Sequence, residues 1–372
     1  MVRKLLLLIG IILSCISIGV LILVSRSSSK NGFVRVFAKN PLQFEFGQNL
    51  GFNSYYISGL TSSTVYLGNI TAPDHVLRLN YINRDTSHLK LPLTVNQEVN
   101  VRTRLLVDSG HYYITEKTTN SLICGKLPGG SPLLTSYLPP KSDNMIVLSP
   151  ESFVVRRYES SLGQNILERY NMAATDSLVV QYRLEKQLDG IFCTDGILLK
   201  DPISGQLVYV YFYRNRFTCL DKNLRPILQG QTIDTVGIVK FKLVTLASDN
   251  LKTFANIPLR VNIGCSVYNG LLYVHSSLKA DNQSNTWPHS RSAVDVYTIG
   301  NGRYFYSFYL PLRFMGKPLD RFHVYGNRVF ALHSSYLAVY KLPDQHSLII
   351  FDSTQVVSLL PHHGHSDPWT PY

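Results

Sequence analysis

The sequence is poor in charge and has no long run of either sign. Only 16% of its 372 residues are Asp, Glu, Lys or Arg, and the basic excess behind the net charge of +12 is scattered, with no run longer than a pair such as Arg156-Arg157. Nucleic-acid-binding domains usually gather their basic residues on one face or one helix. We therefore expect no nucleic-acid partner.

Cysteine spacings of the zinc-binding type are also missing. Beyond the N-terminal segment there are four cysteines, and no two of them form a Cys-x-x-Cys pair: Cys124, Cys193, Cys219 and Cys265. One alternative is a disulfide in an oxidising compartment, for which Cys193 and Cys219 are the nearest pair. We favour the other alternative, four small buried hydrophobic residues, because free cysteine is among the most buried residue types.

Helical periodicity is nearly absent after the N-terminal segment. The one amphipathic stretch, SLGQNILERYNM at 161–172, fits better as a strand. Nowhere do strands alternate with helices of about ten residues, which excludes a doubly wound α/β fold. Aromatic residues, in contrast, are abundant, with 23 Tyr and 17 Phe. Such a composition is typical of a well-packed, strand-rich domain.

Residues 5–24 are an uncharged run of leucine, isoleucine and other apolar or small residues. A helix of this length extends roughly 30 Å, which matches the hydrocarbon core of a bilayer. Cleaved signal peptides usually have a shorter apolar region of about 7–15 residues. We predict one signal anchor within residues 1–30. Cleavage after this segment and lipidation at Cys15 stay open as alternatives.

The charges around this run favour neither orientation clearly. Four basic residues come after it between positions 26 and 39 and two precede it, so the positive-inside rule favours a cytoplasmic body. Signal anchors with a short Arg-Lys head, however, commonly export the domain on their C-terminal side. We expect the body to be extracytoplasmic, in the periplasm or the cell envelope.

One sequence motif occurs twice in similar form, as VYNGLLYVHSS at 267–277 and as VYGNRVFALHSS at 324–335. Similar strands, each followed by a turn and further short strands, occur in six units. The first strong strands of these units lie at 63–69, 111–117, 152–159, 206–214, 270–277 and 327–335. Their spacing of about 41 to 64 residues is close to the length of a propeller blade.

Six packets of short antiparallel strands indicate radial repetition, which leaves only short and protected sheet edges. We predict an all-β fold, a six-bladed β-propeller over residues 31–360. The anchor in 1–30 precedes it, and a flexible His-rich tail occupies 361–372. Residues 33–46 are strand-like and come before the first unit, so we expect them to pair with the last blade and close the ring.

The units resemble NHL-type and TolB-like six-bladed propellers, in which a turn precedes a Y-V-x-D strand and the following strand carries an I-x-V-F pattern. Residues 273–276 read YVHS and fit that frame, but Ser276 stands in place of the usual Asp, as Ser334 does in the last unit and Gly68 in the first. The resemblance covers residues 50–352 and implies the fold without carrying over site residues. The chain also resembles membrane-anchored, Tyr-rich propeller proteins of Bacteroidetes, through the stretch at 194–217.

The pairs His275-Ser276 and His333-Ser334 suggest a nucleophile beside its base. Neighbouring residues on a strand point to opposite faces, however, and neither phrase has the G-x-S-x-G context of a nucleophile elbow. We interpret both pairs as polar strand ends. His275 and His333 remain candidate binding residues, and no catalytic residue is assigned.

The C-terminal stretch HHGHSDPW at 362–369 is the densest group of metal-ligand types. Its candidates are His362, His363, His365 and Asp367. Imidazole and carboxylate are common ligands of divalent metals, but Pro and Gly mark this stretch as a tail, and a metal site needs preorganised geometry. We expect no cofactor, while a structural or catalytic divalent metal stays open as an alternative.

A hydrolase of the lactonase kind would need acidic ligands near the central channel. Candidates cluster in the fourth and fifth units: Asp189, Asp195, Asp221, Asp281, Asn282 and Asp295. Asp195 is kept as a binding candidate, although Asp195-Gly196 fits a tight turn. Tyr211 shares a strand face with Tyr209 and Tyr213. Packing between blades is our interpretation of this row, and a ligand platform is the alternative that makes Tyr211 a candidate.

Our leading hypothesis is a membrane-anchored, extracytoplasmic propeller that binds a protein, peptide or glycan partner without chemistry of its own. Residues 5–24 provide its membrane contact. The alternatives are a metal-dependent propeller hydrolase and a structural component of a cell-envelope assembly.

Overall fold

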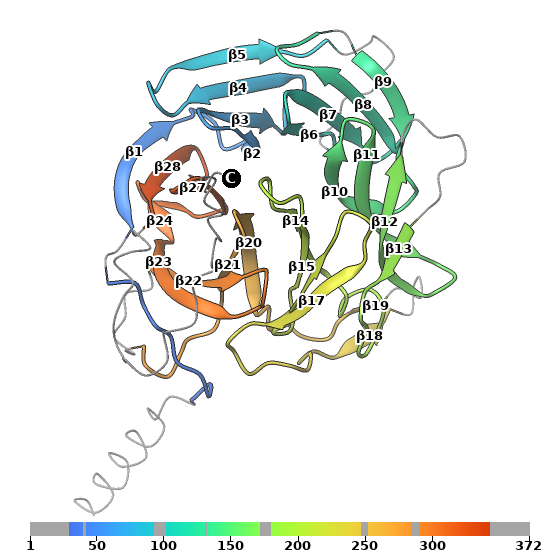
Figure 1. Cartoon of the computed structure of the whole chain (residues 1–372), viewed down its shortest axis with the longest axis vertical. Coiled ribbons are helices and arrows are strands. Elements are labelled where there is room, and N and C mark those ends of the chain that lie inside the picture. The colour runs from blue at the N-terminus through green and yellow to red at the C-terminus, as the bar shows by residue number, and fades with distance from the viewer. Residues whose placement is uncertain are drawn as a thin grey trace, which may run out of the picture.

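The computed structural model describes residues 30–39, 42–92, 102–130, 132–171, 180–246, 252–283 and 290–342. Within these ranges, six four-stranded antiparallel sheets stand in a ring, and no helix occurs (Figure 1). The chain is a six-bladed β-propeller, as the repeats predicted. The predicted anchor run 5–24 and tail 361–372 lie outside the described residues.

Each blade has four strands, which we call A to D from the central channel outward. Blade one consists of β2 (Tyr55–Leu60), β3 (Thr64–Asn69), β4 (His75–Asn80) and β5 (Thr86–Lys90). Blade two consists of β6 (Arg104–Asp108), β7 (His111–Glu116), β8 (Ser121–Lys126) and β9 (Pro132–Tyr137). Blade three consists of β10 (Ser142–Ser149), β11 (Ser152–Glu159), β12 (Gln164–Asn171) and β13 (Val180–Arg183). Blade four consists of β14 (Gly196–Lys200), β15 (Leu207–Tyr211), β16 (Arg216–Leu220) and β17 (Pro226–Gln231). Blade five consists of β20 (Asn262–Tyr268), β21 (Leu271–Ser276), β22 (Arg291–Thr298) and β23 (Tyr304–Pro311). Blade six consists of β26 (Arg321–Tyr325), β27 (Arg328–His333), β28 (Tyr336–Lys341) and β1 (Gln43–Asn49).

The ring closes through its N-terminal strand. β1 pairs antiparallel with β28 and is the outer strand of blade six. Residues 36–38 lie along the outer strand of blade five instead, where Ser307 donates to the Val36 carbonyl and Ala38 donates to the Ser307 carbonyl, both over 2.8 Å. The N-terminal segment therefore joins two blades. The prediction that it pairs with the last blade is correct for 43–46, whereas residues 36–38 pair with blade five.

The hydrophobic core is divided among the six seams between neighbouring blades. Alternation along each strand sends one side chain to one seam and the next to the other. In β15, for example, Val208 and Val210 pack against blade five, whereas Tyr209 and Tyr211 pack against blade three. Tyr209 and Tyr211 of the predicted tyrosine row are therefore packed between blades, whereas Tyr213 packs in a separate cluster with Phe241.

Aromatic rings cover glycines on neighbouring strands at three places. The pairs are Tyr56 with Gly68, Tyr112 with Gly125 and Phe217 with Gly230. A Cβ on Gly125 would lie 2.3 Å from the Tyr112 ring, and one on Gly68 would lie 2.6 Å from the Tyr56 ring. Gly68, which occupies the family's Asp position in the first unit, thus makes room for an aromatic ring.

The repeating phrase corresponds to strand B of each blade, so VYNGLLYVHSS contains the second strand of blade five, β21. The stretch at 161–172 contains strand β12, as expected. All four described cysteines are buried and free, which agrees with the hydrophobic interpretation. The stretch SLIIFD at 347–352, whose sequence also predicts a strand in the last unit, lies outside the described residues. Among those that are described, none forms a helix long and apolar enough to cross a bilayer.

Two further hairpins extend from the ring. β18 (Leu243–Thr245) pairs with β19 (Lys252–Phe254) in the connection between blades four and five, and β24 (Arg313–Phe314) pairs with β25 (Lys317–Pro318) before blade six. The propeller has two faces. We call the face with the A–B and C–D turns the AB face, and the face with the connections between blades the DA face.

Candidate functional site

His275 and His333 lie at the DA ends of two B strands, β21 and β27. Both rings are buried, with 6% and 0% of the residue exposed, and burial lowers the pKa of each to about 4. Among the described residues, Nε2 of His275 has no hydrogen-bond partner. His275 packs edge-on near the Phe322 ring, whereas the Ser276 hydroxyl accepts a hydrogen bond from Leu278. The structure thus keeps each imidazole neutral inside a seam.

Asp195 and Tyr211 are both fixed by internal contacts. The buried guanidinium of Arg156 pairs with Asp195 and Asp143 and donates to the Tyr209 hydroxyl over 3.2 Å. The Tyr211 hydroxyl accepts a 3.0 Å hydrogen bond from the Glu185 amide, and burial raises its pKa to about 12. Both candidates therefore connect blade four to blade three.

Two other acidic candidates accept hydrogen bonds from backbone amides. Asp189 accepts amide hydrogen bonds from Ile191 and Phe192, and Asp221 caps the turn between β16 and β17. Within the described ranges, no three His, Cys, Asp or Glu side chains come together in a way that could hold a metal ion. His362, His363, His365 and Asp367 lie outside those ranges.

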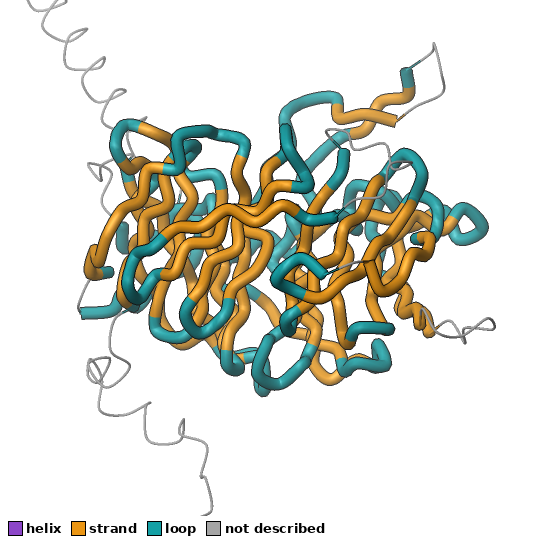
Figure 2. Tube along the Cα trace, turned by 90° about the horizontal axis from the view of Figure 1, so that it is seen from above, coloured by secondary structure: helices purple, strands orange, loops and turns teal. Residues whose placement is uncertain are grey.

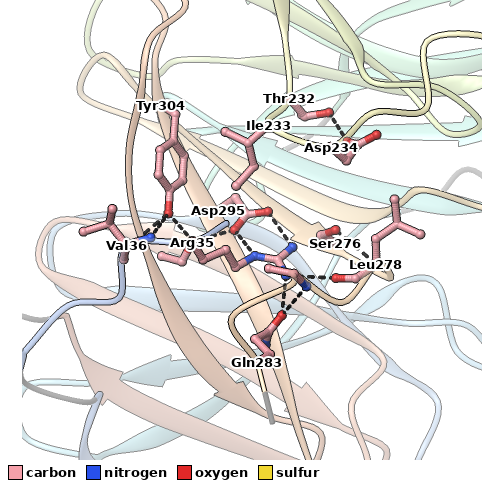
Figure 3. Close-up of polar contacts among 12 residues, drawn as sticks. Arg35, Val36, Thr232, Ile233, Asp234, Ser276, Leu278, Gln283, Asp295 and Tyr304 are labelled. Atoms are coloured by element: carbon pink, nitrogen blue, oxygen red, sulfur yellow. Dashed lines mark hydrogen bonds and ion pairs between the residues drawn. The ribbon is translucent and has the colours of Figure 1, made fainter. Parts of the chain in front are cut away.

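The acids of blade five anchor the N-terminal segment. Figure 3 shows the guanidinium of Arg35 donating to both oxygens of Asp295, over 2.7 and 2.9 Å, with side-chain exposures of 0% and 3%. Asp281 accepts hydrogen bonds from the amides of Asn31 and Gly32. Burial alone would lower the pKa of Arg35, but the hydrogen bonds to Asp295 outweigh it and the pKa is raised.

A polar groove that is open to solvent begins on the AB face, beside the channel. Lys200 ends β14, and its ammonium donates to the Val147 carbonyl of blade three over 2.7 Å and pairs with Asp108 of blade two. One lysine therefore ties three consecutive inner strands together. Its side chain is 17% exposed, so it also forms part of the groove that starts there.

A groove of about 530 Å³ runs from Lys200 along the seam between blades three and four. One wall is the end of β10 with the start of β11, and the other is formed by the turns at 204–206 and 221–222 of blade four. A second groove of about 610 Å³ continues toward the rim, between the ends of β12 and β13 and residues 223–226. We call the two together the basic groove.

Arg169 lines both parts of the basic groove. Its Nε donates to the Ser152 hydroxyl over 3.1 Å, and its Nη1 donates to the Asn223 side chain across the seam. These contacts position the guanidinium where the two parts meet. A planar guanidinium suits carboxylate or phosphate recognition because it can donate two parallel hydrogen bonds.

The lining of the basic groove carries a net positive charge. Four positive side chains line it, namely Arg169, Lys200, Lys222 and Arg225. Among its described lining residues the one acid is Asp221, whose carboxylate is used by the turn amides of Asn223 and Arg225. Glu168 lies nearby but is 2% exposed and paired with Arg157. The groove therefore attracts anions.

Of the candidate site residues that the structure describes, Asp221 lines this groove, and its carboxylate accepts hydrogen bonds from the amides of Asn223 and Arg225. Arg169 and Lys200 lie within the strand sequences NILERYN and GILLK. No local motif marks them, because their proximity comes from the packing of blade three on blade four.

No protein-family model matches the chain, and no curated protein is detectably similar to it in sequence. Solved structures share its fold. A member of the DUF4221 family from Bacteroides vulgatus superposes with a TM-score of 0.52 at 11% identity, over 84% of this chain and 98% of that one. Virginiamycin B lyase from Staphylococcus aureus gives 0.46 at 10% identity and BamB from Moraxella catarrhalis 0.41 at 9%, each over 81% of this chain and 100% of the other. At these identities the likeness is one of fold alone.

Proposed function

We propose that the chain is a membrane-anchored, extracytoplasmic binding module whose basic groove receives an acidic segment of a protein, peptide or glycan partner. The observation that carries this proposal is the groove itself. Four cationic side chains surround it, and one of them, Arg169, is held at its centre by Ser152 and Asn223. A partner carboxylate could take a charge-assisted hydrogen bond from a guanidinium that is already ordered, which lowers the entropy cost of binding.

The positions of the sequence candidates support binding without chemistry. Asp195 is engaged by Arg156, and Asp295 by Arg35. His275 and His333 are buried in seams away from the basic groove. An anchor in residues 5–24 and an extracytoplasmic body complete the proposal, supported by the length of the uncharged run.

The test measures binding of a fluorescent oligoglutamate peptide to the full chain by anisotropy. Lys222→Glu with Arg225→Glu should weaken binding roughly tenfold, which corresponds to about 1.4 kcal/mol. The matched control, Lys240→Glu with Lys242→Glu, changes the same number of charges on the opposite face and should leave binding unchanged. Equal weakening by both pairs would show attraction to net charge rather than to the groove and would contradict the proposal.

A further inference from the structure

The hairpin β18–β19 lies on the DA face, whereas the basic groove lies on the opposite AB face. Figure 2 shows this two-stranded element rising from one side of the propeller. Its inner side is firmly packed: the Phe254 ring lies 4.5 Å from that of Phe192 and 5.2 Å from that of Phe241. Leu243, which pairs with Phe254 across the hairpin, joins the same cluster. The hairpin is therefore held in place by its own apolar core.

The outer side of this region is also apolar, although it faces solvent. Six aliphatic side chains are exposed there, at 98% for Ile257, 71% for Ile238, 63% for Leu188, 44% for Val244, 44% for Leu246 and 40% for Leu259. Leu188 belongs with the others because the neighbouring Gln187 exchanges hydrogen bonds with Gly237 and Val239. Exposed aliphatic residues gathered in this way mark a surface that is covered by a partner.

Basic residues alternate along the chain with most of these aliphatic side chains. Four exposed basic residues lie in the same connection: Lys240, Lys242, Lys252 and Arg260. In the described part of residues 232–261 the single acid is Asp234, which is buried and hydrogen-bonded to Thr232. Near Leu188, Glu185 lies 3.5 Å from Arg214 and Asp189 accepts hydrogen bonds from turn amides. Exposed aliphatic side chains interspersed with basic ones match the interfacial region of an anionic membrane, which offers both an apolar layer and negative headgroups.

The chain enters the propeller on this same face. The Asn31 carbonyl accepts a 2.7 Å hydrogen bond from Thr235, which lies in the connection that carries the hairpin. Asn31 and Gly32 are also fixed by Asp281 of blade five. The uncharged run 5–24 ends only a few residues earlier. A bilayer that holds this run therefore lies next to the DA face at blades four and five.

We infer that the hairpin face, defined as the six aliphatic and four basic residues above, docks on an anionic lipid surface. The inference rests on the anchor in the proposed function. The aliphatic side chains enter the headgroup region, and the lysines near the surface are attracted to anionic lipid. Docking fixes the orientation of the propeller, so that the basic groove on the AB face points away from the membrane toward its partner.

The experiment compares amide hydrogen exchange of the full chain in nanodiscs of phosphatidylcholine alone and in nanodiscs that also contain phosphatidylglycerol. We expect amides in 238–246 and 252–259 to exchange roughly tenfold more slowly with the anionic lipid. The AB turn at 201–206 should exchange equally in both. The triple variant Lys240→Glu, Lys242→Glu, Lys252→Glu should lose the difference, whereas Lys222→Glu with Arg225→Glu should keep it.

Three results would overturn the docking. These are equal exchange of the hairpin in both nanodiscs, equal slowing on the AB face, and slowing that occurs only in native membranes, which would indicate a protein occupant. Carbonate washing of native membranes tests the anchor separately. If the wash retains the chain but anionic lipid does not slow amide exchange in the hairpin, the docking is contradicted and the anchor is not. A chain that is released, yet whose hairpin is protected by anionic lipid, supports docking and contradicts the anchor.

Discussion

The guanidinium of Arg35 and the carboxylate of Asp295 form a two-bond ion pair across 260 positions of sequence, with both side chains almost completely buried. This pair attaches the segment ahead of β1 to blade five, and β1 then completes blade six. The polar network in Figure 3 thus joins the segment ahead of the propeller to blade five.

Arg35→Ala should destabilise the protein by about 3–5 kcal/mol, because it leaves the Asp295 carboxylate buried without its partner. The matched control is Arg328→Ala. Its pair with Glu45 also holds the N-terminal region, but the two side chains are 29% and 24% exposed, so the loss should stay below about 1 kcal/mol. Urea unfolding measures both, and equal losses would contradict the importance of the buried pair.

Gly125→Ala should destabilise by about 1–3 kcal/mol through overpacking, because the new Cβ would lie 2.3 Å from the Tyr112 ring. At Gly264, another strand glycine, the nearest atom to an added Cβ is 3.8 Å away. Gly264→Ala should therefore change the stability by less than about 1 kcal/mol. Thermal unfolding compares the two variants. A Gly125→Ala protein as stable as the parent would show that the Tyr112 ring can move aside.

Acidification should destabilise the protein between about pH 6.5 and pH 4. Burial lowers the pKa of His275 and of His333 to about 4 and outweighs the attraction of Asp295 and Asp320. An unfolded imidazole has a pKa of about 6.5, so in this range the unfolded chain binds more protons and the folded state loses up to about 3 kcal/mol per histidine.

The double variant His275→Leu, His333→Leu should flatten this pH dependence. His323, whose pKa burial also lowers to about 4, accounts for the slope that remains. His88→Leu, at an exposed position, should leave the slope unchanged. Unfolding free energies measured across this pH range would contradict the assignment if the double variant kept the full slope.

Lys200→Met should destabilise the contacts among the inner strands β6, β10 and β14, because the ammonium binds both Asp108 and the Val147 carbonyl. Hydrogen bonds of charged groups contribute about 1.5–3 kcal/mol each, and we expect a loss near the lower value because the Lys200 and Asp108 side chains are 17% and 26% exposed. Hydrogen exchange should quicken at 105–108 and 146–148. Lys222→Met, at an exposed turn of the same groove, should leave these amides unchanged. Unchanged exchange in Lys200→Met would contradict the bridging role.

Binding of an acidic peptide in the basic groove should weaken steeply with ionic strength, because its charges are close to solvent and are screened within about 10 Å at 0.1 M salt. The slope of log affinity against log salt concentration should be smaller in Lys222→Glu with Arg225→Glu than in the parent. A salt-independent affinity would indicate an apolar binding mode and would contradict the groove assignment.

Much of the fold can be predicted from local sequence. The B strands are aromatic and β-branched, as in LLYVHS of β21, and they begin after turns such as Asn269-Gly270, where both residues have positive φ. The A strands have a weaker sequence signal. β10, with the sequence SDNMIVLS, begins with polar residues and has little alternation, because an inner strand lies beside the channel and its pattern is set by neighbouring blades.

The sequence by itself determined the number of blades, the all-β class and the unusual character of residues 5–24, because periodicity and hydrophobicity are local properties of a chain. Only the tertiary structure decided which polar residues are free to bind. It buried His275 and His333 and engaged Asp195 and Asp295 with arginines from elsewhere in the chain. It also brought Arg169 of blade three to Asn223 of blade four. Such contacts depend on how one sheet packs on the next, and no local pattern encodes that packing.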